Sequence, residues 1–282
     1  MEGIIEKNEY KSLAGVLPQV EKLYFKGNVD LLNDGLIRLA VVGSRRVSDY
    51  GRWVLKNWIE DFVRSNMIVV SGFMYGVDQL AHRECVVKGG KTIAILGWGI
   101  GRKVSGEDEK LFDQILDQGG LILSEYEGDM SGTKWSFPRR NRIVSGISDA
   151  VLVIEAGLNS GSLITAKYAV NQEKKLFAVP GGIDREMSKG TNWLIKNCKA
   201  EVATTSRDVL DIFGLNSKYQ LSKSDTTDPI LELLKFGDKS LDEIASVLRI
   251  DANVVAARLT ELMLMGEVCE WGGKYKRGVY DS

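Results

Sequence analysis

Short apolar segments alternate with amphipathic segments through most of the chain, and this pattern limits the possible folds more than any other feature. The apolar segments cover residues 36–43, 67–72, 91–96, 121–124, 150–155 and 175–179. Between the first of them, apolar residues recur at helical spacing over 49–65 and 76–88. The alternation predicts βαβ units, and therefore a mainly parallel sheet with helices on both faces. We expect an α/β fold with a Rossmann-like, doubly wound sheet.

A second, smaller domain is predicted at the C-terminal end. Residues 216–228 are polar and lack apolar periodicity, which is typical of a linker. Three helices are expected after it, over 229–236, 240–248 and 251–265, and a glycine-punctuated hairpin follows through Tyr280. Three helices and a hairpin are typical of a winged helix-turn-helix. The predicted domains are an N-terminal extension (1–33), the Rossmann-like domain (34–214), a linker (215–228) and a winged-helix domain (229–282).

The composition excludes several classes of protein. With 37 Lys and Arg against 38 Asp and Glu, and 44% hydrophobic residues, the chain has the profile of an ordinary globular protein. Its three cysteines are far apart, so they form neither a disulfide framework nor a paired zinc motif. His82 is the only histidine, which excludes a histidine-rich metal site and disfavours most hydrolase mechanisms. We expect a cytoplasmic protein without a membrane span, metal ion or cofactor.

Polar residues follow the first predicted strand of the sheet, where open parallel sheets bind their ligands. Gly43, Ser44 and Arg45 come directly after the apolar run. Ser44 and the following amides can cradle a phosphate, and Arg45 adds charge and a planar group of donors. The glycine spacing is not that of a dinucleotide-binding motif. The alternative interpretation is a tight turn with solvated arginines.

The segment KWSFPRRNR, residues 134–142, holds four cations, two aromatic residues and no acid. It falls between two predicted strands, where we expect a ligand-binding loop. Because bases stack on aromatic rings while cations contact phosphates, this segment predicts a surface for single-stranded nucleic acid. A solvated basic surface is the alternative.

Other loops at the same edge of the sheet also favour an anion. Ser160, Gly161 and Ser162 open a predicted helix whose free amides would face a ligand, and Lys167 lies one turn further on. The glycine-rich segment 97–101 lacks a fitting helix start, so we interpret it as structural. His82 and Cys85 share one helix, but two ligands do not make a zinc site, and packing explains them better.

The predicted winged helix is acidic. Residues 221–282 carry eight cations and eleven acids, a net charge of −3, and the third helix offers only Arg258. A helix that reads the major groove needs phosphate-binding cations and base-edge donors, which this helix largely lacks. This domain is therefore predicted to mediate protein contact or regulation.

Six blocks of the sequence together resemble the DNA-processing protein A family, DprA or Smf, of bacterial natural transformation. In chain order they are LYFKGN (23–28), AVVGSR (40–45), VSG with GVD and AH (70–82), FPRRNRI (137–143), SGSLITA (160–166) and VPG (179–181). The chain departs from the family's pattern after Gly97, which lacks the usual Tyr-Pro pair, and at Cys198 and Lys199, where Gly-Ala is typical.

The resemblance implies a Rossmann-like core that binds single-stranded DNA, forms homodimers and helps load a RecA-type recombinase while protecting incoming strands. It implies no catalytic turnover. Combined with the residue patterns above, it makes the candidate DNA-binding residues Gly43, Ser44, Arg45, Lys134, Phe137, Arg139, Arg140, Asn141, Ser162 and Lys167.

Two other functions stay open at this point. In the first, a Rossmann-like nucleotide-binding protein would hydrolyse the glycosidic bond of a nucleoside monophosphate, with Gly181, Gly182 and Glu155 as its candidate residues. Such enzymes continue the PGG loop into Gly-Thr and a catalytic Glu, whereas IDR follows here. In the second, the chain would be a nucleotide-sensing winged-helix regulator, which the acidic third helix disfavours.

Overall fold

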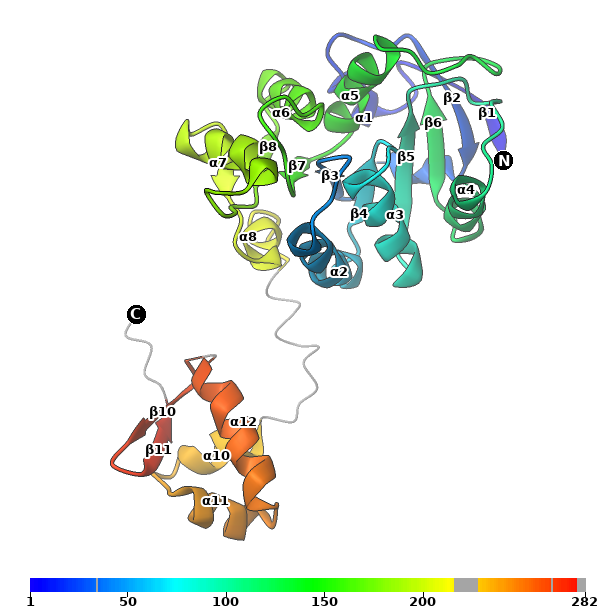
Figure 1. The fold of residues 1–282 in the computed structure, drawn as a ribbon. Helices are drawn as coiled ribbons and strands as arrows, with labels where there is room; N and C mark the ends of the chain where they lie inside the picture. The colour runs from blue at the N-terminus through cyan, green and yellow to red at the C-terminus, as the bar shows by residue number, and fades with distance from the viewer. Residues whose placement is uncertain (34, 216–227, 265, 278–282) are drawn as a thin grey trace. The chain divides into compact units, whose positions relative to one another are not determined.

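The computed structural model describes residues 1–33, 35–215, 228–264 and 266–277. The chain divides into two compact units, residues 1–216 and 217–282 (Figure 1). No helix in these ranges is both long enough and apolar enough to cross a membrane.

The first unit is built on a nine-stranded mixed sheet in the order β1-β2-β6-β5-β4-β3-β7-β8-β9. The strands are β1 (Glu2–Glu6), β2 (Lys22–Gly27), β3 (Arg38–Val42), β4 (Ile68–Ser71), β5 (Thr92–Leu96), β6 (Leu121–Ser124), β7 (Ala150–Val153), β8 (Lys175–Ala178) and β9 (Glu201–Val202). The strands from β6 through β9 in this order are parallel, whereas β1 and β2 pair antiparallel. The sheet is therefore mainly parallel, as the alternating pattern predicts, and residues 1–33 add two strands to it.

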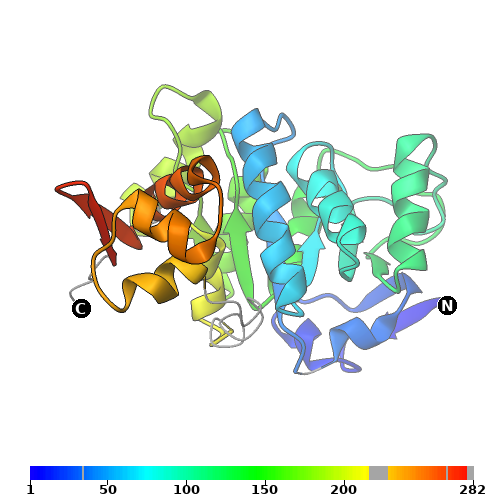
Figure 2. The same ribbon diagram turned by 90° about the horizontal axis from the view of Figure 1, so that it is seen from below.

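Helices cover both faces of this sheet. They are α1 (Lys11–Ala14), α2 (Asp49–Arg64), α3 (Val77–Val87), α4 (Glu107–Asp117), α5 (Ser136–Gly146), α6 (Ser162–Asn171), α7 (Lys189–Lys196) and α8 (Ser206–Asp211), with short 3-10 turns η1 (Val29–Leu32) and η2 (Glu186–Ser188). Figure 2 shows α2, α3 and α4 side by side along one face. Buried residues of α5 and α6 pack in the core on the other face of the sheet.

Alternate residues of the central strands face opposite layers of the core. In β3, Leu39 and Val41 pack with α2, while Ala40 and Val42 pack with the layer that contains Ile143 of α5. All four side chains are almost fully buried. This two-sided burial explains why the strand lacks polar alternation, as expected for a parallel sheet covered on both faces.

The second unit consists of α10 (Pro229–Leu234), α11 (Leu241–Leu248), α12 (Ala252–Leu264) and the antiparallel pair β10 (Val268–Trp271) and β11 (Lys274–Arg277). Its helices begin at good capping residues. The Asp228 side chain accepts from the Ile230 amide, and Ser240 and Glu243 form a reciprocal capping box. Three helices and a hairpin match the predicted elements. Most of the predicted linker, residues 216–227, and Tyr280 lie outside the described residues.

One predicted loop is a helix in the structure. The basic aromatic segment that we predicted as a loop is largely helical, because α5 begins at Ser136 and carries its residues from Phe137 onward. Pro138 is compatible with this helix because it lies in the first turn, where the backbone N–H groups have no partner within the helix. The prediction of a loop was therefore wrong.

Candidate functional site

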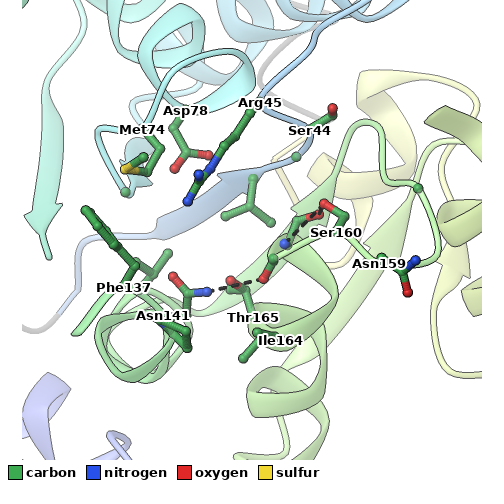
Figure 3. Close-up of a pocket in the computed structure, with 18 of the residues that line it drawn as sticks. Ser44, Arg45, Met74, Asp78, Phe137, Asn141, Asn159, Ser160, Ile164 and Thr165 are labelled. Atoms are coloured by element: carbon green, nitrogen blue, oxygen red, sulfur yellow. Dashed lines mark hydrogen bonds between the residues drawn. The ribbon is translucent and has the colours of Figure 1, made fainter. Parts of the chain in front are cut away.

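A cavity of about 790 Å³ opens at the carboxyl ends of β3 and β7 (Figure 3). These neighbouring strands mark the place where the strand order reverses, because β4 to β6 lie on one side of β3 and β7 to β9 on the other. Ligands of open parallel sheets bind at such a switch point, where adjacent loops separate. The cavity is lined by loops after β3, β4 and β7, by the turn before α5, by the starts of α5 and α6, and by Glu186 and Met187 of η2.

The loop after β3 is held by hydrogen bonds within itself and to neighbouring segments. The Val77 amide donates to the Ser44 carbonyl at 3.1 Å. The Ser44 hydroxyl accepts from the Arg46 amide at 3.0 Å and contacts the Met187 sulfur at 3.0 Å. A Cβ at Gly43 would lie 2.6 Å from the Val77 side chain, so only glycine allows this approach. Ser44 therefore shapes the loop, while the exposed side chains of Arg45 and Arg46 carry its charge.

Phe137 forms part of the cavity wall. Its ring lies edge-on to Trp98, with centroids 6.1 Å apart, and the Arg45 guanidinium carbon is 6.0 Å from its centroid. A Cβ on Gly97 or Gly132 would come within 2.5 Å of this ring, so both glycines leave it room. A cation over an aromatic face is attracted by the ring's quadrupole. The two residues therefore form one surface that offers a flat ring beside a positive charge.

The turn before α5 places Lys134 at the cavity. The Thr133 amide donates to the Ser136 hydroxyl at 2.8 Å, and the Ser136 amide donates to the Thr133 hydroxyl at 3.1 Å. The Ser136 hydroxyl in turn donates to the Gly97 carbonyl at 2.6 Å. These bonds satisfy the start of the helix and fix the turn. Lys134 is exposed and lines the cavity from this fixed turn.

Arg140 is buried beneath the cavity and has a structural role there. Its guanidinium donates to the carbonyls of Gly72 and Ile95, which end β4 and β5. Burial lowers the pKa of Arg140 to about 10, so it remains charged at neutral pH. Burial also raises the pKa of Asp78 to about 6, although Arg140 and bonds from Ser71, Gly72 and Met74 oppose the shift.

His82 extends this buried polar region into the sheet. The Thr92 hydroxyl donates its single proton to the Val69 carbonyl at 2.6 Å, so it accepts from His82 Nδ1, 2.7 Å away. Burial, together with the nearby charge of Arg140, lowers the pKa of His82 to about 3, so the ring is neutral. His82 is therefore a hydrogen-bonded core residue. The described residues contain no cluster of three or more His, Cys, Asp or Glu side chains suited to a metal ion.

The side of the cavity formed by Asn141 and the start of α6 carries amide and hydroxyl groups beside the apolar Leu158 and Ile164. Asn141 of α5 donates to the Gly161 carbonyl at 3.2 Å and so connects α5 to the start of α6. The Ser160 and Ser162 hydroxyls are 2.7 Å apart. Figure 3 shows Asn141 and Ser160 facing the same space as Arg45. This side offers amide and hydroxyl groups that can hydrogen-bond to a phosphate or a base edge.

Eight of the ten candidate residues line this one cavity, namely Gly43, Ser44, Arg45, Lys134, Phe137, Arg140, Asn141 and Ser162. Arg139 and Lys167 do not line it. Arg139 is exposed and pairs with Glu125 at 3.3 Å, and Lys167 is exposed on α6. Sequence reasoning missed Arg46, Asn159 and Thr165, which also line the cavity. Arg46 follows Arg45 directly, so its position after the strand was an available signal.

The family model for DNA recombination-mediator protein A matches residues 4–214. The chain belongs to this family. Protein Smf of Escherichia coli is 36% identical over 268 residues, covering 90% of this chain and 71% of that protein. This match extends into the second unit. DNA processing protein DprA of Streptococcus pneumoniae is 38% identical over 191 residues, covering 68% of this chain and 66% of that protein.

Two solved structures of family members share the fold. DNA processing protein A of Streptococcus pneumoniae superposes with a TM-score of 0.68 at 34% identity, covering 74% of each chain. The Helicobacter pylori protein, described for its unique single-stranded DNA binding mode, also gives a TM-score of 0.68, at 30% identity. That match covers 78% of this chain and 96% of the other.

Proposed function

We propose that this chain binds single-stranded DNA in the cavity at the ends of β3 and β7 and catalyses no reaction. The observation that carries the proposal is that Arg45, from the loop after β3, and Lys134 and Phe137, from the turn before α5 and the start of that helix, line one cavity. Cations bind the phosphates of the strand, and an aromatic ring stacks an unpaired base. The Helicobacter pylori relative, described for its single-stranded DNA binding, supports this assignment.

The shape of the cavity favours a single strand over a duplex. The Phe137 ring lies in a hollow, between Trp98 and Arg45. In a duplex, the faces of the bases are stacked on one another and are not available to such a ring. An unpaired base can turn into the hollow while its phosphate stays near Arg45 or Lys134.

The wider role that we propose comes from family membership. In the cytoplasm, a homodimer of this chain would protect incoming single strands and help load a RecA-type recombinase during natural transformation or recombination. The second unit would be a winged-helix domain that contacts protein. Within it, Arg258 is bound to Asp228 at 2.7 Å and to Glu261 at 2.6 Å, so this cation already has acidic partners.

The arrangement of Glu155 disfavours the hydrolase alternative. Its carboxylate accepts from the Ser48 amide at 2.9 Å and from the Ser48 hydroxyl, so it holds the start of α2. It is 3% exposed and is not among the residues that line the cavity. Gly181 and Gly182 do not line the cavity either. The three residues that this alternative requires therefore do not meet a ligand there.

Fluorescence anisotropy of labelled oligo-dT and a matched duplex, over a salt series, tests the proposal with the full-length chain. We expect tighter, salt-sensitive binding of the single strand, because each phosphate contact releases counterions. Lys110→Ala on α4 is the charge-matched control for alanine variants of the cations that line the cavity. Lys110 is exposed and pairs with Glu107 at 2.9 Å. No binding of oligo-dT at low salt would contradict the proposal and direct attention to nucleotides.

The proposed loading of a RecA-type recombinase is tested in a separate assay. A RecA-type recombinase is mixed with single-stranded DNA coated by single-strand-binding protein, and its filament formation is followed with and without this chain. Faster filament formation that Arg45→Ala abolishes would support loading through the cavity. An unchanged rate, with DNA binding intact, would limit the function to strand protection.

A further inference from the structure

Trp135 lies beside the cavity without lining it. Its neighbours Lys134 and Phe137 are lining residues, whereas the Trp135 side chain is 56% exposed. The reciprocal bonds between Thr133 and Ser136 fix the turn on either side of it. An indole that is exposed on a fixed turn, next to a cation of the cavity, requires an explanation other than core packing.

Tyr126 packs against the indole of Trp135. The two rings are 5.7 Å apart and meet at 83°, an edge-to-face contact. The Tyr126 amide donates to the Ser124 hydroxyl at 3.0 Å, and its carbonyl accepts from the Ile100 amide at 3.0 Å, so its backbone is fixed. A perpendicular contact covers at most one face of the indole. At least one face of Trp135 therefore stays open for a flat partner.

Two arginines are connected to the segment that carries Trp135. Arg139 lies one turn further along α5, its amide donates to the Trp135 carbonyl at 3.2 Å, and its side chain is 55% exposed. Arg139 shares its partner Glu125 with Arg142, which is closer to that carboxylate, at 2.5 Å against 3.3 Å. Arg102 donates to Ser131, four residues before Trp135, at 2.7 Å. Arg139 and Arg102 thus have further N–H donors for a phosphate.

Two acids, Glu127 and Asp129, follow Tyr126 along the chain. Glu127 accepts a hydrogen bond from the Tyr24 hydroxyl at 2.9 Å. Both are exposed and would repel a phosphate. The charge distribution therefore directs the backbone of a bound strand toward Lys134 and Arg139 rather than toward Tyr126.

We infer that Trp135 is a second base-stacking position, outside the cavity, at which an unpaired base of the same strand lies on the open indole face. The inference rests on the proposed function and specifies how the strand leaves the cavity: from Phe137, past Lys134, to Trp135, with Arg139 at the next phosphate. Since Tyr126 already holds the indole in place, little side-chain entropy is lost on stacking.

The test compares Trp135→Ala with wild type in binding oligo-dT at fixed salt. We expect a loss of affinity of about 5- to 150-fold, the range for removing one stacked base. The salt dependence should not change, because no charge is removed. An abasic strand of the same length keeps the phosphates but has no base to stack, so both proteins should bind it equally. Trp53→Ala on α2, where Trp53 is 60% exposed, is the matched control and should bind like wild type.

Tryptophan fluorescence gives a second measurement that does not depend on the alanine variant. Oligo-dT should quench the emission of wild type and of Trp53→Phe, and Trp135→Phe should lose a distinct part of that quenching while keeping most of its affinity. Unchanged affinity of Trp135→Ala for oligo-dT would overturn the inference, and if Arg45→Ala still weakened binding, the proposed function would stand. An altered oligomeric state of Trp135→Ala with unchanged affinity would assign the ring to an interface between copies instead. Failure of wild type to bind oligo-dT would refute both.

Discussion

The guanidinium carbon of Arg45 lies 6.0 Å from the centroid of the Phe137 ring, although Arg45 follows β3 and Phe137 belongs to the first turn of α5. The contact joins the two groups that a single strand requires, a charge for its phosphate and a flat ring for its base. Each group restrains the other. The two residues should therefore contribute to DNA binding as a pair and not as independent contacts.

A double-mutant cycle measures this coupling. Arg45→Ala should weaken oligo-dT binding and reduce the salt slope by about one, as the loss of one phosphate contact does. Phe137→Ala should cost about 1–3 kcal/mol with an unchanged slope, because it removes stacking and not charge. The double variant should lose about 0.5–1 kcal/mol less than the sum of the two. Strict additivity would show that the two residues contact different parts of the strand.

Lys134 and Lys167 offer a comparison between two exposed lysines. Both were candidates from the sequence, but only Lys134 lines the cavity. Lys134→Ala should weaken binding of oligo-dT of any sequence and reduce its salt dependence. Lys167→Ala should leave both nearly unchanged in the same anisotropy titration. Equal effects of the two substitutions would mean that the strand crosses α6 as well.

The main effect of substituting Arg140 should be a loss of stability of the fold. Arg140→Ala leaves the carbonyls of Gly72 and Ile95 without their donor and Asp78 without its opposite charge. We expect the free energy of unfolding to fall by about 3–5 kcal/mol in urea titrations, as when one partner of a buried pair is removed. Arg139→Ala, next to it but exposed, should change stability by less than about 1 kcal/mol. Wild-type stability of Arg140→Ala would contradict the structural role.

His82 and Asp78 predict opposite contributions to the pH dependence of stability. The pKa of His82 is lowered from 6.5 to about 3, so the unfolded chain binds the proton more readily. The contribution of neutral His82 to the free energy of unfolding is complete above about pH 6.5 and is lost as the pH falls toward 3. The pKa of Asp78 is raised from 3.8 to about 6, so its burial destabilises the folded chain increasingly as the pH rises from about 4 to 6.

The larger shift belongs to His82, so wild type should lose stability as the pH falls from 6.5 to 4. His82→Gln should flatten this loss, because the titrating group is gone, and Asp78→Asn should steepen it, because the opposing contribution is removed. Urea unfolding at several pH values measures both changes. A loss of the same steepness in His82→Gln as in wild type would show that other groups set the acid limit.

The sheet could be predicted because its signal is local. The strand Leu121–Ser124 has the predicted limits, and α2, expected over 49–65, spans Asp49–Arg64. Apolar runs buried on both faces leave a clear pattern in the sequence. The helix α4 was not predicted. The segment of α5 was taken for a loop because it was interpreted from its cations, its aromatic residues and its place between two strands.

Residue types near the site were also evident from the sequence, since the carboxyl ends of parallel strands share one edge. By that rule, the sequence predicts that Arg45, Lys134 and Phe137 lie at the same edge of the sheet. The rule cannot tell which of the adjacent residues Arg139 and Arg140 is buried and which is exposed. Their different environments, one buried under β4 and β5 and the other exposed, follow from the rotation of successive residues around α5.

By itself, the sequence determined the alternation of elements, the edge of the sheet that gathers polar residues and the chemistry of those residues, because periodicity and residue type are properties of short segments. Only the tertiary structure decided which side chains share the cavity. It placed Lys134 inside and Trp135 beside it, held Glu155 against Ser48, and put the Arg45 guanidinium over the Phe137 ring. Those relationships depend on contacts between segments far apart in the chain, which no local pattern records.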